Sequence, residues 1–276
     1  MGLIALMLAL LLTGCGGAAP SQSGAASDFA ASSSLPAAVS STVSETISSA
    51  AASAPEPEPE LEPEPVPGEL DGMIVCIDPG HGVTSARGQE AVSPLSGETK
   101  AAYVSGASGR QITEEALNLQ VSLRLRARLE AMGATVVMTR ETNEATVSNI
   151  ERAQIANQAG ADVCIRIHAD GIEDSSVNGV SVLIPAGSLL GTPAIAEPSA
   201  ALGQLMVDAV AAQTGAKNRG TTERRDLTGF NWSEVPCVLL EMGFLSNAQE
   251  EANMIDPAYQ DKIVEGIAAA LVQWAS

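Results

Sequence analysis

Short apolar runs rich in β-branched residues recur along the chain between residues 73 and 241. Runs of this length and composition are typical of buried β-strands. The clearest of them lie at 73–78, 134–139, 162–168, 179–184 and 237–241. A further short strand is expected over 219–227, where the pattern is weaker.

Between these runs, apolar residues recur at the three- to four-residue spacing of a helix. In the segment 113–132, Thr113 is a plausible N-cap and Gly133 ends the pattern. Its apolar stripe consists of Leu117, Val121, Leu125 and Leu129. Further helices are expected at 148–159, 200–214 and 257–274. Strands that alternate with helices predict an α/β fold, here a single three-layer domain with a mostly parallel twisted sheet and helices on both faces.

The first 70 residues have a different composition and contain no Lys or Arg. Residues 16–54 are mainly Ala, Ser and Gly, and residues 55–68 are a Pro-Glu repeat. Neither tract can bury enough apolar surface to fold, so we expect a disordered linker over 16–70. The folded domain is therefore predicted to span residues 71–276.

The N-terminus has the features of an export signal. Residues 3–12 are apolar but too short to span a bilayer, for which about 20 residues are needed. They lead into Leu-Thr-Gly-Cys at 12–15, which resembles the lipobox of bacterial lipoproteins. This resemblance implies a signal peptide over 1–15, cleavage before Cys15 and a diacylglycerol on its sulfur. The mature chain is then expected outside the cytoplasm, anchored to the outer face of the bacterial membrane.

Composition excludes two further classes of protein. The formal net charge of −19 argues against binding nucleic acid, or an anionic membrane surface, through general electrostatics. Apart from Cys15, the cysteines lie singly inside apolar runs, at Cys76, Cys164 and Cys237. Their pattern indicates buried free thiols rather than a disulfide framework.

Both histidines of the chain end predicted strands. His81 follows the strand at 73–78, and His168 ends the strand at 162–168. Ligands of α/β folds collect at the carboxyl ends of the strands, so the two imidazoles are expected to converge there. A catalytic zinc needs three protein ligands and one open position. Glu114, in the first turn of the helix at 113–132, is a candidate for the third ligand, and Glu115 competes for the same role.

Glu241 lies at the end of another apolar run, Val-Leu-Leu-Glu, at 238–241. An ionised carboxylate is costly to bury without a partner. A general base beside a metal centre has such a partner, and an ion pair with an arginine is the structural alternative. The position of Glu241 at a strand end favours the general base.

Four segments together resemble the signature blocks of the zinc-dependent N-acetylmuramoyl-L-alanine amidases of the type 3 family. They are Ile-Asp-Pro-Gly-His-Gly at 77–82, Thr-Glu-Glu-Ala-Leu-Asn-Leu at 113–119, Asp-Val-Cys-Ile-Arg-Ile-His-Ala-Asp at 162–170 and Val-Leu-Leu-Glu-Met-Gly-Phe-Leu-Ser-Asn at 238–247. The resemblance implies that His81, Glu114 and His168 bind Zn²⁺ and that Glu241 is the catalytic glutamate.

The same resemblance implies the reaction. Its substrate is peptidoglycan, and the bond cleaved joins N-acetylmuramic acid to the L-alanine of the stem peptide. A zinc peptidase acting within the stem peptide, or a non-catalytic wall-binding module, is the alternative. We expect the chain to act as a monomer.

The chain departs from the family pattern in three respects. The segment between His81 and Glu114 is long, with an insert over 83–111. Arg166 stands where a small residue is frequent in the family, and no wall-binding repeat follows the domain. Arg166 and Arg225 are candidates for binding the carboxylates of the stem peptide, although a solvated surface position is the expected alternative for both.

Overall fold

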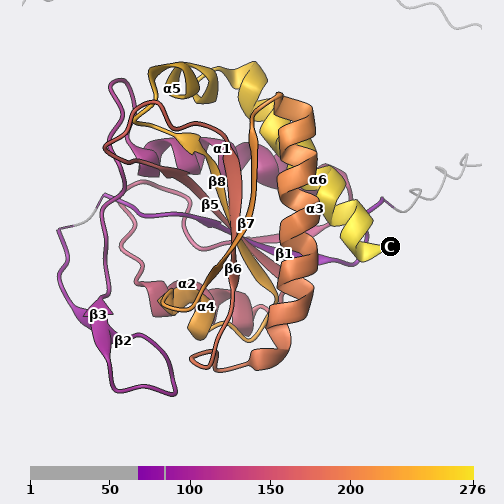
Figure 1. Cartoon of the computed structure of the whole chain (residues 1–276). Coiled ribbons are helices and arrows are strands. Elements are labelled where there is room, and N and C mark those ends of the chain that lie inside the picture. Colours follow the sequence, from indigo (N-terminus) through magenta and orange to yellow (C-terminus); the bar gives the residue numbers. More distant parts are fainter. Residues whose placement is uncertain (1–67, 84) are drawn as a thin grey trace, which may run out of the picture. The chain divides into compact units, whose positions relative to one another are not determined.

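The computed structural model describes residues 68–83 and 85–276, which form an α/β domain (Figure 1). Its six-stranded sheet has the order β4-β1-β5-β8-β6-β7. The strands are β1 (Ile74–Pro79), β4 (Thr135–Met138), β5 (Val163–Asp170), β6 (Val180–Pro185), β7 (Asn218–Arg224) and β8 (Cys237–Phe244). Neighbouring strands run parallel except for β6 and β8, which are antiparallel. The predicted mostly parallel sheet is therefore confirmed.

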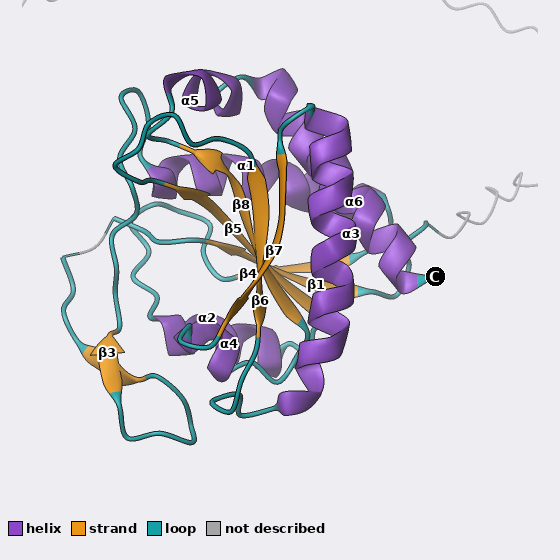
Figure 2. Cartoon of the chain, in the orientation of Figure 1, coloured by secondary structure: helices purple, strands orange, loops and turns teal. Residues whose placement is uncertain are grey.

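Helices cover both faces of the sheet, as the α/β prediction requires (Figure 2). Three long helices cover one face, with the third packed against the other two: α1 (Glu114–Ala131), α3 (Ala196–Thr214) and α6 (Pro257–Ala275). Two shorter helices in mutual contact cover the other: α2 (Asn149–Gln158) and α4 (Thr228–Asn231). A third short helix, α5 (Ala248–Met254), follows β8, and a 3-10 turn over Pro193–Ile195 precedes α3.

The two faces of the sheet carry cores of unequal size. Alternate residues of β1, β5 and β8 point to opposite faces. One set, including Val75, Ile165 and Leu240, joins a large apolar core under the three long helices. The other set joins a smaller core built on Cys76, Cys164, Cys237 and Leu239. All three cysteines are free and buried, as predicted.

The smaller core ends before the strands do. On its face of the sheet, the next residues after the buried Cys76, Cys164 and Leu239 are Asp78, Arg166 and Glu241. The short helices α2 and α4 cover the apolar part of this face. Charged side chains therefore replace apolar ones at the carboxyl ends of the central strands, on the face covered by α2 and α4, here called the thinly covered face.

Several elements differ from the sequence prediction. The insert at 83–111 contains a small antiparallel hairpin of β2 (Gln89–Ala91) and β3 (Thr99–Ala101), which was not predicted. Neither α4 nor α5 was predicted. The folded domain also begins before residue 71, because Leu70 is 2% exposed and its N–H donates to the carbonyl of Met132. No helix among the described residues has the length and apolar character needed to cross a membrane.

Candidate metal centre

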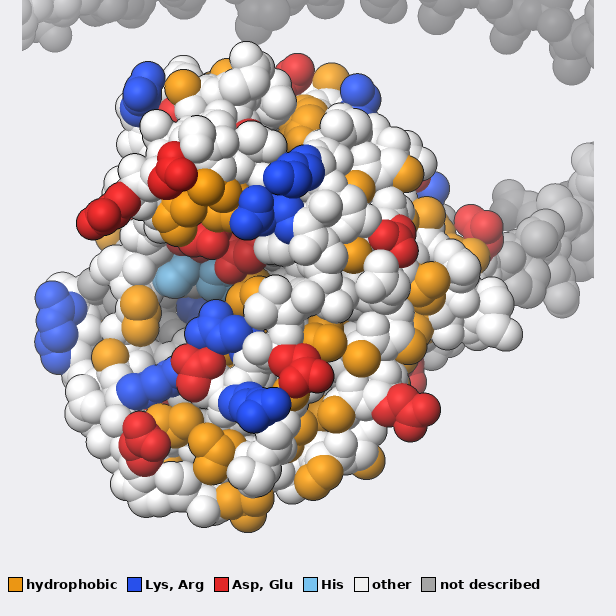
Figure 3. Space-filling model, viewed as in Figure 1, with side chains coloured by type: hydrophobic (Ala, Val, Ile, Leu, Met, Phe, Trp, Pro, Cys, Tyr) orange, Lys and Arg blue, Asp and Glu red, His pale blue; other side chains and the backbone are white. Residues whose placement is uncertain are grey.

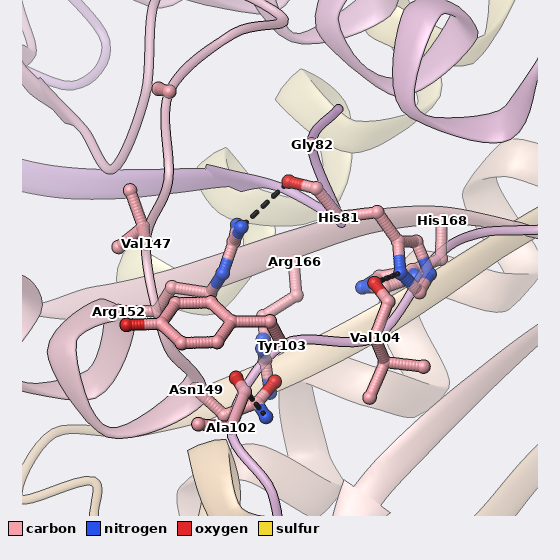
Figure 4. A pocket seen from close by; sticks show the side chains of 11 residues that line it. His81, Gly82, Ala102, Tyr103, Val104, Val147, Asn149, Arg152, Arg166 and His168 are labelled. Atoms are coloured by element: carbon pink, nitrogen blue, oxygen red, sulfur yellow. Dashed lines mark hydrogen bonds between the residues drawn. The ribbon is translucent and has the colours of Figure 1, made fainter. Parts of the chain in front are cut away.

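His81 is delivered by a tight turn after β1. Its backbone has φ +60°, an uncommon conformation for a residue with a side chain. A Cβ atom at the preceding Gly80 would collide with the ring of His168, so only glycine lets the turn approach β5. The ring Nδ1 of His81 lies 2.8 Å from the carbonyl oxygen of Val104, which belongs to the insert (Figure 4).

Glu114 joins the two histidines. Its Oε1 lies 3.1 Å from Nε2 of His81 and 2.9 Å from Nδ1 of His168. The two rings are nearly perpendicular, with centroids 4.8 Å apart. The ligand atoms of these three residues lie within 4.8 Å of one another, the one such cluster of three or more among the described residues. The structure thus brings Glu114, and not Glu115, to the two histidines.

The hydrogen-bonding roles at His81 leave a position between two acceptors in this cluster. A carbonyl oxygen only accepts hydrogen bonds, so Nδ1 of His81, facing the carbonyl of Val104, carries the ring proton. In the neutral ring, Nε2 is then an acceptor that faces a second acceptor, Oε1 of Glu114, at 3.1 Å. Either a second proton or a metal ion must lie between them. Two imidazoles and one carboxylate form a donor set that suits zinc.

The electrostatics of two residues of the cluster, Glu114 and His168, favour their metal-binding forms. Burial raises the pKa of Glu114, but hydrogen bonds from His168 and His81 outweigh it and hold the pKa well below its usual value. Burial lowers the pKa of His168 to about 4, so its ring is neutral at physiological pH. Burial also lowers the pKa of His81, but the hydrogen bond with Glu114 leaves it raised overall. An ionised carboxylate and a neutral imidazole are the forms that bind metals.

Backbone and side-chain contacts fix the orientation of Glu114, the third candidate ligand. The Oε2 atom of Glu114 accepts a 2.7 Å hydrogen bond from the N–H of Ala107, and the N–H of Glu114 donates to the carbonyl of Ala107 at 3.0 Å. One turn along α1, Asn118 donates to Oε1 of Glu114 and to the carbonyl of Gly80. The insert, through Val104 and Ala107, therefore helps to orient two of the three candidate ligands.

Glu241 lies directly beside this cluster. In the sheet register, it is opposite His168 on the adjacent strand, and both side chains are on the thinly covered face. Its Oε2 atom is buried and has no hydrogen-bond partner among the described residues. Burial raises the pKa of Glu241 well above its usual value, and the charges of Glu114 and Asp170 raise it further. The described residues form no ion pair with it, contrary to the structural alternative.

A buried ionic network lies beneath the histidine turn. Asp78 is fully buried and accepts from Nη1 of Arg152 at 2.6 Å, from Nε of Arg166 at 2.7 Å and from the hydroxyl of Thr139. Burial raises the pKa of Asp78, but the two guanidinium charges hold it well below its usual value. Arg152 also donates to the carbonyl of His81 at 2.6 Å. The network therefore fixes the backbone that carries the first ligand.

This network corrects one expectation and supplies residues that sequence reasoning missed. The side chain of Arg166 is 7% exposed, so the solvated surface position expected as its alternative is wrong. Asp78 and Arg152 were not singled out from the sequence. A charged residue at the end of the apolar run 73–78 was a usable signal for Asp78, whereas nothing local marked Arg152.

The remaining candidate residues lie apart from the cluster. Arg225 is 74% exposed in its side chain, and its Nη2 is 3.5 Å from Glu223. The candidate lipidation site Cys15 lies outside the described residues.

A pocket opens beside the two histidines. It is lined by residues of the insert, of the segment that enters α2 and of β5, among them Tyr103, Val104, Asn149, Arg152 and Arg166 (Figure 4). On the surface, the histidines lie at the edge of a hollow, and Lys and Arg side chains lie along its lower border (Figure 3). The cluster is therefore accessible to a ligand from outside.

Comparison with known proteins identifies relatives of the chain. The sequence profile of the N-acetylmuramoyl-L-alanine amidases matches residues 75–273. An N-acetylmuramoyl-L-alanine amidase of Mycobacterium tuberculosis is 31% identical over 217 residues, which cover 74% of this chain and 89% of the relative. The amidase LytC of Bacillus subtilis is 29% identical over 71% of this chain, but the match spans only 34% of LytC.

Solved structures give the same result. The amidase Ami1 of Mycobacterium smegmatis has a TM-score of 0.66 and 32% identity, and the match covers 73% of this chain and 98% of Ami1. The catalytic domain of CwlV from Bacillus (Paenibacillus) polymyxa has a TM-score of 0.60 and 27% identity, over 74% of this chain and 98% of that domain. These matches cover the α/β domain with its four signature segments, and the chain belongs to the N-acetylmuramoyl-L-alanine amidase family.

Proposed function

We propose that the chain is a zinc-dependent peptidoglycan hydrolase that cleaves the amide bond between N-acetylmuramic acid and the L-alanine of the stem peptide. One observation carries the proposal. The ligand atoms of His81, Glu114 and His168 lie within 4.8 Å of one another, and Glu241, whose Oε2 has no partner among the described residues, lies opposite His168. The names of the relatives supply the substrate and the bond.

In the proposed reaction, His81, Glu114 and His168 hold the zinc ion and Glu241 moves the proton. A bound zinc ion polarises the scissile carbonyl and lowers the pKa of water to about 7. Glu241 takes a proton from the attacking water and gives it to the leaving nitrogen of L-alanine. A carboxylate that first accepts and then returns a proton works best with a pKa near the operating pH, and the burial of Glu241 raises its pKa in that direction.

Analysis of the products tests the proposed bond. The full chain should release intact stem peptides from purified peptidoglycan, each with a new L-alanine amino terminus. A chelator should stop the release, and added zinc should restore it. New amino termini within the stem peptide would instead identify a peptidase, and binding without any product would identify a wall-binding module.

We further propose that Cys15 carries a lipid anchor that holds the monomeric chain outside the cytoplasm. The proposal rests on the apolar run at 3–12 and on the Leu-Thr-Gly-Cys that follows it. Mass spectrometry of the mature protein purified from its own cells should find Cys15 as the first residue, with a diacylglycerol on its sulfur. An unmodified chain that begins elsewhere would refute the anchor.

A further inference from the structure

Arg166 has hydrogen-bond donors that the described part of the protein does not use. Its Nε donates to Asp78 at 2.7 Å, but its Nη1 and Nη2 make no hydrogen bond with the described residues. The side chain is 7% exposed, and it lines the pocket beside the two histidines (Figure 4). These two nitrogens are not among the polar atoms that are fully buried without a partner, so they are open to water or to a ligand in the pocket.

The space for this guanidinium depends on Gly229 in α4. A Cβ atom there would collide with Nη1 of Arg166. The backbone of α4 therefore packs against one edge of the guanidinium, while Asp78 holds its Nε. Arg166 is held in a defined orientation rather than left to move in solvent, as a recognition group requires.

Three arginines lie buried near the pocket. Asp78 is the one carboxylate paired with both Arg152 and Arg166. Arg140 lies in the same buried region, and its hydrogen bonds go to backbone carbonyls and to Asn143. On the opposite wall, the N-terminus of α2 already holds the carboxylate of Glu90, which accepts from Nδ2 of Asn149 at 2.8 Å. The anionic ligand is therefore expected at the two arginines that line the pocket, Arg152 and Arg166, which share a single carboxylate.

The chemistry of the proposed substrate indicates which of its groups would bind beside Arg166. The lactyl carboxyl of N-acetylmuramic acid is consumed in the scissile amide, and the rest of the sugar is neutral. The first negative charge on the peptide side is the α-carboxylate of the second stem residue, a D-glutamate linked through its side chain. It lies within about 7 Å of the scissile nitrogen. Arg166 and His168 are two residues apart on one face of β5, also about 7 Å.

We propose that the pocket lined by Arg166 is a subsite for the α-carboxylate of the second residue of the stem peptide. The subsite makes the enzyme selective for stems in which this carboxylate is free over stems in which it is amidated. A carboxamide has no charge and turns an NH₂ group toward the guanidinium. This inference rests on the proposed function, since it assumes that the stem peptide lies beside the candidate metal centre.

A matched pair of substrates tests the subsite. Two N-acetylmuramoyl tripeptides, L-Ala–γ-D-Glu–L-Lys, would differ only in a free or an amidated α-carboxyl group. The full chain should hydrolyse the free acid with a kcat/KM roughly 10- to 100-fold higher, mainly through KM, as a charge-assisted hydrogen bond allows. Equal rates, or a preference for the amide, would overturn the proposal whatever any variant does.

Substitutions then test whether Arg166 causes the preference for the free α-carboxylate. Arg166→Gln should bring the ratio of the two kcat/KM values to about one, and Arg166→Lys should leave an intermediate ratio. Arg128→Gln is the control, because it removes an arginine that pairs with Glu265 on α6 and should keep the wild-type ratio. An unchanged ratio in Arg166→Gln would overturn the assignment.

A binding measurement separates the subsite from the proposed function. Titration calorimetry would compare the product-type tripeptides, with free and amidated α-carboxyl groups, on the wild-type chain. Tighter binding of the free acid supports the subsite even if neither substrate is cleaved, a result that would refute only the hydrolysis. Equal binding of the two peptides would refute the subsite.

Discussion

Replacement of Glu241 by glutamine is expected to lower kcat by about 10²- to 10⁴-fold, the usual contribution of a general base. Glutamine has nearly the same shape but cannot take the proton of the attacking water. Glu241 lies opposite His168 in the sheet and is not one of the three residues whose ligand atoms converge. The metal content of Glu241→Gln is therefore expected to equal that of the wild type.

The measurement combines zinc analysis and hydrolysis of purified peptidoglycan on the same samples. Glu265→Gln is the matched control, because Glu265 is partly exposed and pairs with Arg128 on the far helical layer. This control should retain both metal and activity. If Glu241→Gln kept its zinc and also hydrolysed at the wild-type rate, Glu241 would not be the base.

Much of the fold could be predicted because its strands and long helices carry strong local patterns. The stripe of α1 and the apolar runs of β1, β5 and β8 needed no tertiary information. The hairpin of β2 and β3 was missed because its strands are three residues long and mostly polar. The direction of β6 was also not evident, because the apolar pattern of a strand is the same whether it pairs parallel or antiparallel.

The candidate site could be predicted where its residues end such patterns. His81, His168 and Glu241 all lie at the ends of apolar runs, which meet at one edge of the sheet. The choice between Glu114 and Glu115 could not be made from spacing, since both lie in the first turn of α1. The position of that turn relative to β5 decides it, and this is a tertiary property.

The environment of Arg166, in contrast, could not be predicted from the sequence. Its place in an apolar strand gave no partner, because the partner, Asp78, is 88 residues away on β1. The two residues are register neighbours in the sheet, so the pair exists only once β1 and β5 are aligned.

The second large effect is expected at the metal centre itself. Glu114→Gln removes the negative charge from the donor set, although an amide oxygen can still accept from the N–H of Ala107. Loss of a direct ligand should weaken zinc binding by at least about 100-fold, the upper range seen when only a supporting residue is lost. Hydrolysis of peptidoglycan should fall with it.

Glu115→Gln is a closely matched control for this experiment. It makes the same chemical change one residue along the same helical turn. The backbone carbonyl of Glu115 accepts from Arg140, and its side chain is outside the cluster of ligand atoms. The substitution leaves both the carbonyl and the cluster intact, so zinc binding and activity should be unchanged.

Zinc bound per chain, measured by elemental analysis on wild type, Glu114→Gln and Glu115→Gln after dialysis against a weak chelator, is the most direct test of the metal centre. The expected result is one zinc per chain in the wild type and in Glu115→Gln, and close to none in Glu114→Gln. A full equivalent of zinc in Glu114→Gln, or its loss from Glu115→Gln, would contradict the assignment of His81, Glu114 and His168 as the ligands.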